Sequence, residues 1–104
     1  MIRVKIFRDG ELLTGFETKG HAGTADSGSD VICAFVSSAC YMAANTVTDI
    51  IGLQAEAADA DGYMRLSIAE RPDKAQDILN GLRLHLTELE KQYPERIKVT
   101  ITEE

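Results

Sequence analysis

Residues 30–52 read DVICAFVSSACYMAANTVTDIIG and form the most apolar stretch of the chain. Their apolar side chains recur at helical spacing around nearly the whole circumference, which predicts one helix that starts at Asp30 and ends at Gly52. A helix that is apolar on nearly every side is expected to be buried on more than one side. We therefore expect the fold to be built around this helix.

Strand patterns lie on both sides of the predicted helix. Residues 2–7 alternate between apolar and polar side chains, and Asp9-Gly10 signals a hairpin into a second strand at about residues 11–21. Residues 53–58 and 63–69 form a second hairpin around residues 59–62. A helix with one apolar stripe begins near Pro72 and is stopped by Pro94, and residues 97–101 alternate in a last strand. This order, ββαββαβ, predicts an α+β fold with a five-stranded, mostly antiparallel or mixed sheet and two helices.

Length, charge and the N-terminal pattern limit the possible functions. The 104 residues are expected to form one domain, residues 1–104. The net charge of −6 argues against a nucleic-acid partner, although an acidic surface would attract a basic protein. The first residues alternate like a strand rather than a signal peptide, and no run of about 18 apolar residues is apparent. We therefore expect no membrane partner and a cytoplasmic location, where thiols stay reduced.

One histidine and one cysteine lie on either side of a loop rich in glycine and serine. Cys33 is expected in the first turn of the apolar helix, where the helix dipole favours a thiolate and free amides can receive an oxyanion. Ser29 or Asp30 is expected to cap that helix. His21 ends the preceding strand and can act as the base of a Cys–His nucleophile.

The supporting residues and the second cysteine allow more than one interpretation. Asp30 either orients the imidazole or only caps the helix, and Ser37 either lines the site or bonds back to its own helix. A free cysteine such as Cys33 is often just a small buried hydrophobic residue. Cys40 lies two turns deeper and is expected in the core. About 10 Å of helix separates the two thiols, too far for a disulfide.

Metal and phosphate sites are not expected. No compact metal-binding spacing is formed by the cysteines and histidines, which are Cys33, Cys40, His21 and His85. The glycines at 20, 23 and 28 lack the spacing of a phosphate-binding loop. The sequence therefore predicts neither a metal nor a cofactor.

Residues 20–38 resemble the signature of the ribosomal-processing cysteine protease family. Gly20-His21-Ala22 is similar to the opening of that signature, and Gly28 with Asp30-Val31-Ile32-Cys33-Ala34 is similar to its second block, which Ser37 follows. The resemblance extends over essentially the whole chain. This chain departs from the family pattern in having Val31-Ile32 where Ile-Val is commoner, and in the larger Phe35.

The resemblance implies a cytoplasmic bacterial cysteine protease that removes a short N-terminal extension from a large-subunit ribosomal protein, L twenty-seven. It implies His21 as general base, Cys33 as nucleophile, and Asp30 and Ser37 as supporting residues. Gly20, Ala22, Gly23, Gly28 and Ala34 would belong to the loop and the substrate-binding region. Residues 22–32 would form a mobile loop over the site, the enzyme would be a homodimer, and hydrophobic and aromatic residues would surround the cut.

Two other classes of function remain open from the sequence. One is a ribosome-associated binding module with no catalysis, in which the buried thiol is incidental. The other is a hydrolase or transferase that acts on a different thiol-reactive substrate.

Overall fold

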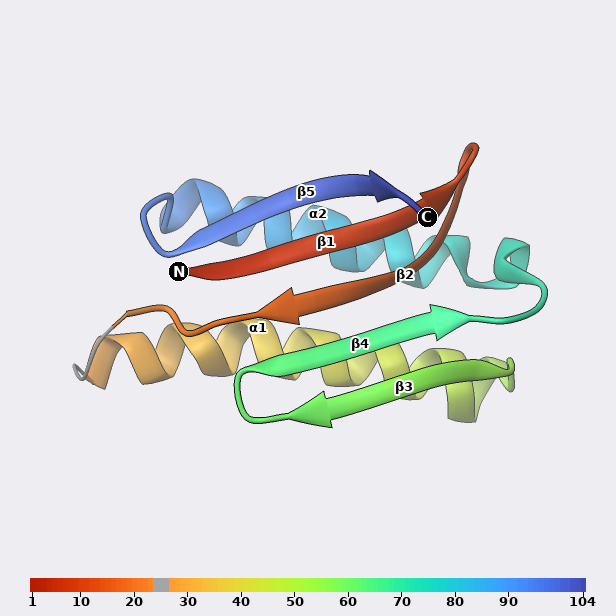
Figure 1. Ribbon diagram of the computed structural model, residues 1–104, viewed down its shortest axis with the longest axis horizontal. Helices are drawn as coiled ribbons and strands as arrows, with labels where there is room; N and C mark the ends of the chain where they lie inside the picture. Colours follow the sequence, from red (N-terminus) through yellow and green to blue (C-terminus); the bar gives the residue numbers. More distant parts are fainter. Residues whose placement is uncertain (24–26) are drawn as a thin grey trace.

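The computed structural model describes the backbone of residues 1–23 and 27–104 and the side chains of residues 1–23 and 31–104. The predicted α+β fold and the order ββαββαβ are confirmed (Figure 1). The strands are β1 (Ile2–Asp9), β2 (Leu12–Lys19), β3 (Ala55–Ala60), β4 (Tyr63–Ile68) and β5 (Ile97–Glu103). The helices are α1 (Ser27–Asn45), which continues as a π-helical segment (Thr46–Ile51), and α2 (Gln76–Gln92), which follows a 3₁₀ turn (Pro72–Ala75).

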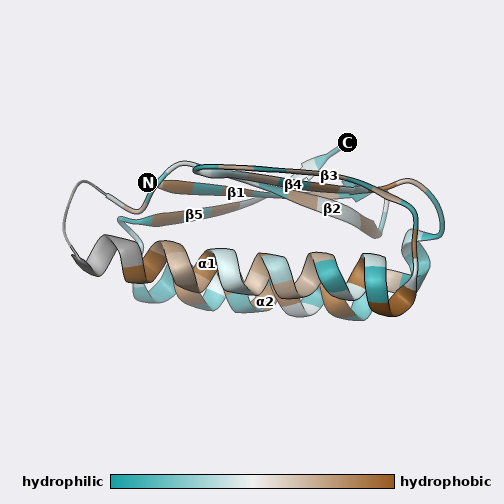
Figure 2. Cartoon of the chain, turned by 90° about the horizontal axis from the view of Figure 1, so that it is seen from below, coloured by the Kyte–Doolittle hydropathy of each residue, from teal (hydrophilic) through white to brown (hydrophobic). Residues whose placement is uncertain are grey.

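The five strands form one mixed sheet in the order β3-β4-β2-β1-β5. β1 pairs in parallel with β5, and the other neighbouring strands are antiparallel. β2 and β4 are therefore neighbours although α1 and β3 separate them in sequence. Both helices pack on the same face of the sheet, which gives a molecule of two layers (Figure 2).

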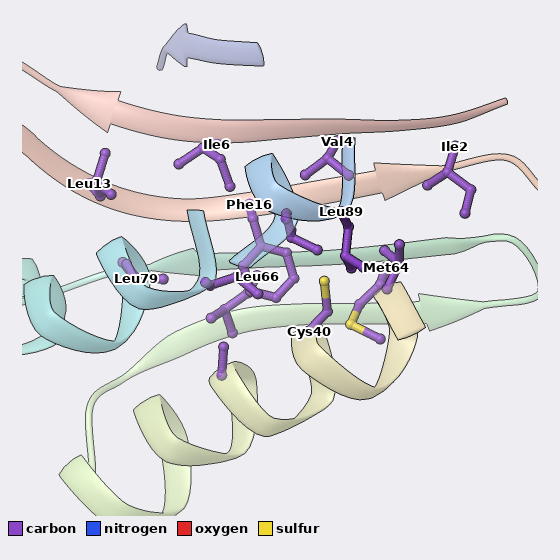
Figure 3. Close-up of a cluster of buried hydrophobic side chains, with 14 of the residues drawn as sticks. Ile2, Val4, Ile6, Leu13, Phe16, Cys40, Met64, Leu66, Leu79 and Leu89 are labelled. Atoms are coloured by element: carbon purple, nitrogen blue, oxygen red, sulfur yellow. The ribbon is translucent and has the colours of Figure 1, made fainter. Parts of the chain in front are cut away.

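The core lies between the sheet and the two helices. Phe16 and Leu66 are opposite each other on β2 and β4 and have no exposed surface. Cys40 and Val47 are equally buried on the helical side, where Cys40 points toward the sheet (Figure 3). Leu86 on α2 is also completely buried. At about 25 cal/mol per Å² of apolar surface removed from water, this layer is the main source of stability.

The start of α1 differs from the prediction. The helix begins at Ser27, three residues before Asp30, so Ser29 and Asp30 lie inside the helix and neither is its N-cap. Extending an existing helix by one residue adds a hydrogen bond, while Ser and Gly each lower helix stability by only about 1 kcal/mol or less. The predicted end is confirmed, because Gly52 takes the left-handed conformation with φ of 80°. The predicted loop between His21 and the helix is therefore shorter: residues 27–32 of the loop implied at 22–32 are helical, and residues 24–26 lie outside the described residues.

The burial of the apolar helix also differs from the expectation. One side of α1 lies on the sheet and a flank contacts α2, but Val31, Met42 and Ile50 keep 50%, 53% and 79% of their surface exposed. Contrary to the expectation from the sequence, residues 31–51 are, by length and mean hydropathy of 1.5, apolar enough to cross a membrane. In this fold the sheet covers one face of that helix and buries Cys40 and Val47 completely.

Candidate active site

A pocket of about 140 Å³ opens where three elements meet at one end of the sheet. Its walls come from the end of β2, the second and third turns of α1, and the turn that joins β3 to β4. The end of β2, that turn and the start of β1 lie together in Figure 1. The lining residues are Ile2, Thr18, Gly20, His21, Cys33, Val36, Ser37, Asp59, Ala60, Asp61, Gly62, Tyr63 and Met64. The structure thus brings the predicted nucleophile and the predicted base to the same cavity.

The thiol of Cys33 is half-buried and is contacted by a backbone amide. The N–H of Ala22 donates a hydrogen bond to Cys33 Sγ across 3.3 Å. Ala22 itself is buried, with 1% of its surface exposed, so its amide is shielded from solvent beside the sulfur. An N–H donor aimed at sulfur interacts more strongly with a thiolate than with a thiol, because the acceptor then carries the charge.

His21 follows the end of β2 and is exposed to solvent at the mouth of the pocket. Its ring lies against Gly62 in the β3–β4 turn, because a Cβ atom added to Gly62 would come within 2.8 Å of His21 Nε2. The residue before it, Gly20, donates its N–H to the carbonyl oxygen of Gly62 across 2.9 Å. The imidazole therefore lies just beyond the end of the central strand β2, against the β3–β4 turn.

The expected place of Cys33 in the first helical turn is wrong. Counted from Ser27, Cys33 is the seventh residue of α1, so its own amide lies within the hydrogen-bonded part of the helix. The dipole effect falls off within the first turn, and the free helix-start amides belong to residues before Cys33. The amide that reaches the sulfur comes from Ala22 instead.

The other predicted site residues are divided between several places. Ser37 lies one turn after Cys33 and lines the same pocket. Ala34 lies on another side of α1, where it lines a groove between α1 and α2. Gly23 is exposed beside the buried Ala22. Gly28 is a residue of α1, and the side chain of Asp30 lies outside the described residues, so its role as histidine orienter stays a prediction.

The β3–β4 turn contributes residues that sequence reasoning did not assign to the site. Asp59, Asp61, Gly62 and Tyr63 all line the pocket. The Asp-Gly turn that contains these residues is recognisable in the sequence. The sequence does not show that this turn lies next to His21. It reaches the site because β4 pairs with β2, with Tyr63 opposite Lys19.

The second cysteine and second histidine lie away from this pocket. Cys40 is fully buried, which confirms the core prediction, and burial raises the pKa of its thiol to about 12. His85 is exposed beside the groove between α1 and α2. Among the residues that the structure describes, no three His, Cys, Asp or Glu side chains are grouped so that they would hold a metal ion.

The two thiols should therefore react very differently with iodoacetamide. Near pH 6 we expect Cys33 to be alkylated while Cys40 stays unmodified, because Cys40 is inaccessible and its pKa of about 12 leaves almost no thiolate. Peptide mass spectrometry of the two cysteine-containing fragments measures both rates. Equal and slow modification of Cys33 and Cys40 in the folded protein would contradict an activated Cys33.

Comparison with known proteins agrees with the chemistry of this pocket. A family model described as cysteine protease Prp matches residues 1–98. The chain is 30% identical over 95 residues to the ribosomal processing cysteine protease Prp of Bacillus subtilis (strain 168), and the match covers 85% of each chain.

Solved structures extend the similarity to the whole fold. The essential ribosomal processing protease Prp from S. aureus, in complex with a covalently linked product peptide, superposes with a TM-score of 0.85 at 25% identity. That match covers 98% of this chain and 100% of the other. SMU.848 from Streptococcus mutans superposes with a TM-score of 0.82 at 25% identity, over 100% of this chain and 96% of the other. The resemblance seen in residues 20–38 is confirmed: this chain belongs to the cysteine protease Prp family and is a cysteine protease.

Proposed function

We propose that this protein removes the short N-terminal extension of the large-subunit ribosomal protein L twenty-seven by means of a Cys33–His21 dyad. The observation that carries the proposal is that His21 and Cys33 line one pocket, in which an amide hydrogen bonds to the sulfur. The relatives from B. subtilis and S. aureus are named as ribosomal processing proteases, which supports a ribosomal substrate. The covalently linked peptide in the S. aureus relative supports a covalent intermediate.

The proposed reaction uses Cys33 as the nucleophile and His21 as the base. His21 takes the proton of Cys33, and the thiolate attacks the scissile carbonyl carbon. As the tetrahedral intermediate collapses, His21 returns the proton to the leaving amine and an acyl-enzyme remains on Cys33. Water activated by His21 then hydrolyses the thioester and restores the thiol.

The oxyanion of the tetrahedral intermediate forms next to the sulfur. The Ala22 N–H already lies 3.3 Å from Sγ, so it is a donor near the position that the negative oxygen would occupy. A fixed donor of this kind needs no reorganisation during the reaction, since Ala22 is buried.

The pocket wall and the whole chain are acidic. Asp59 and Asp61 line the pocket, and the net charge of the chain is −6. Such a surface attracts a basic polypeptide, as ribosomal proteins generally are. We place this reaction in the bacterial cytoplasm, where Cys33 stays reduced.

The direct test is incubation with purified L twenty-seven that carries its extension, followed by intact-mass spectrometry. We expect a single cut that removes the extension, no cut in the same ribosomal protein made without the extension, and no cut after treatment with iodoacetamide. Stable binding of the extended protein without any cleavage would favour the binding-module alternative and contradict the proposal.

We also propose that the enzyme is a homodimer whose copies meet through the helical layer. The groove between α1 and α2 has a volume of about 990 Å³ and is lined mainly by apolar side chains, among them Phe35, Met42 and Leu82. Phe35 and Met42 keep 40% and 53% of their surface exposed, and none of the described residues covers the helices on the side away from the sheet (Figure 2). An exposed apolar surface of this kind is typical of an interface.

A charge placed in that groove should separate the two copies. Met42→Glu is expected to shift the protein to a monomer in sedimentation-velocity centrifugation, because a carboxylate would have to be buried in the interface. Ile101→Glu is the matched control, since Ile101 is 51% exposed but lies on the edge strand β5. A monomeric wild type, or dissociation by Ile101→Glu alone, would contradict an interface on the helices.

A further inference from the structure

The imidazole of His21 rests on the backbone of the β3–β4 turn. A Cβ atom at Gly62 would lie 2.8 Å from Nε2, 3.1 Å from Cε1 and 3.5 Å from Cδ2 of His21. Real Cβ atoms essentially never come within 3.0 Å of such atoms, so any side chain at position 62 would push the ring away. Gly62 also has φ of +69°, a conformation that residues with a side chain rarely adopt.

The backbone of the residue before His21 is held by the same turn. Gly20 donates its N–H to the Gly62 carbonyl oxygen across 2.9 Å. On its other side Gly20 lies so close to the start of β1 that a Cβ atom there would come within 2.4 Å of the Met1 carbonyl oxygen. The chain just before His21 is therefore fixed between the β3–β4 turn and Met1.

The turn is also tied to the helix that carries the nucleophile. The hydroxyl of Tyr41 donates a hydrogen bond to Asp59 Oδ2 at the end of β3. Tyr41 lies two helical turns after Cys33 on α1, so this bond connects the hairpin to the same rigid helix. Asp59 and Gly62 both line the pocket that contains Cys33 and His21. The β3–β4 hairpin thus contacts both α1, the helix that carries Cys33, and the imidazole ring of His21.

We propose that Gly62 is a positioning residue for the dyad: the β3–β4 turn sets where the His21 imidazole lies relative to Cys33. This inference rests on the proposed role of His21 as the base. A displacement of about 1 Å in a reacting group can lower the rate about 10²-fold, so the absence of a side chain at position 62 has a direct effect on turnover.

The chain contains a matched control for this proposal. Gly10 lies in the β1–β2 turn with φ of +62°, close to the φ of Gly62, but a Cβ atom there would meet nothing within 4 Å. Gly62→Ala and Gly10→Ala therefore introduce similar backbone strain, and only the first reaches the imidazole. We expect similar losses in melting temperature for both variants. We expect a fall of about 10²-fold in kcat/KM for Gly62→Ala and less than about threefold for Gly10→Ala.

A double-mutant cycle distinguishes positioning from a general structural effect. In a His21→Ala background, Gly62→Ala should cause no further loss, because the ring that it displaces is already absent. A fall in kcat/KM that persists in that background, or Gly62→Ala activity equal to that of Gly10→Ala, would overturn the proposal.

A substrate-free measurement separates this proposal from the proposed function. The rate of Cys33 alkylation by iodoacetamide, followed against pH, should change in Gly62→Ala toward the profile of His21→Ala, while Gly10→Ala keeps the wild-type profile. If the wild type fails to cut L twenty-seven, the proposed function fails, but the alkylation profiles still decide the role of Gly62. A wild-type profile in Gly62→Ala would overturn that role.

Discussion

Cys33→Ala is expected to abolish removal of the ribosomal extension, with a loss of about 10⁴-fold or more in kcat/KM. Without the sulfur no acyl-enzyme forms, and the pocket keeps only its binding contacts and the Ala22 amide. Stability should change little, because Cys33 is only half-buried and its hydrogen bond is to one amide. Mass spectrometry of the ribosomal protein after long incubation measures the residual cleavage, and circular dichroism checks the fold.

The second cysteine is the natural control for that result. Cys40→Ala removes a thiol that is fully buried two turns away on the same helix, so it should lower stability by about 1 kcal/mol and leave cleavage almost unchanged. Cleavage that survives in Cys33→Ala would refute Cys33 as the nucleophile. Loss of cleavage in Cys40→Ala with an intact fold would indicate that Cys40 is the nucleophile. That result would also refute Cys33 as the nucleophile.

His21→Ala is expected to lower kcat by about 10²–10⁴-fold, the usual contribution of a positioned general base. The melting temperature should stay near that of the wild type, because the side chain is exposed and its main packing contact is the surface of the Gly62 turn.

His85→Ala serves as the control for the loss of a histidine. His85 is exposed beside the groove between the helices and does not line the pocket, so activity should remain. A large fall in melting temperature for His21→Ala would indicate a structural histidine rather than a base. Unchanged turnover in the same variant would exclude it from the reaction.

Most of the fold follows from patterns that act over a few residues. The alternation in residues 2–7 and the Asp9-Gly10 turn predict the first hairpin, and both are present as β1 and β2. Gly52 ends the apolar helix as expected, because its left-handed φ is accessible mainly to glycine. These signals are local, so they can be recognised without knowledge of the tertiary structure.

The start of α1 and its burial were predicted less well. Residues 27–29 read as loop because Ser and Gly have low helix propensity, yet the helix extends through them. The apolar residues Val31 and Met42 predict burial, yet both are half-exposed, since the sheet covers only one face of the helix. Hydrophobic spacing indicates which residues can be buried, while the number of neighbouring elements decides which are.

The sequence by itself determined the order of elements, and it predicts Cys33 rather than Cys40 as the nucleophile and His21 as its base. Only the tertiary structure decided which amide faces the sulfur and what supports the imidazole. Ala22 reaches Sγ because the chain folds back from β2 onto α1, and Gly62 reaches His21 because β4 pairs with β2. Both contacts depend on where the backbone of Ala22 and Gly62 lies and not on a particular side chain. The residue pattern at 20–38 therefore cannot predict them.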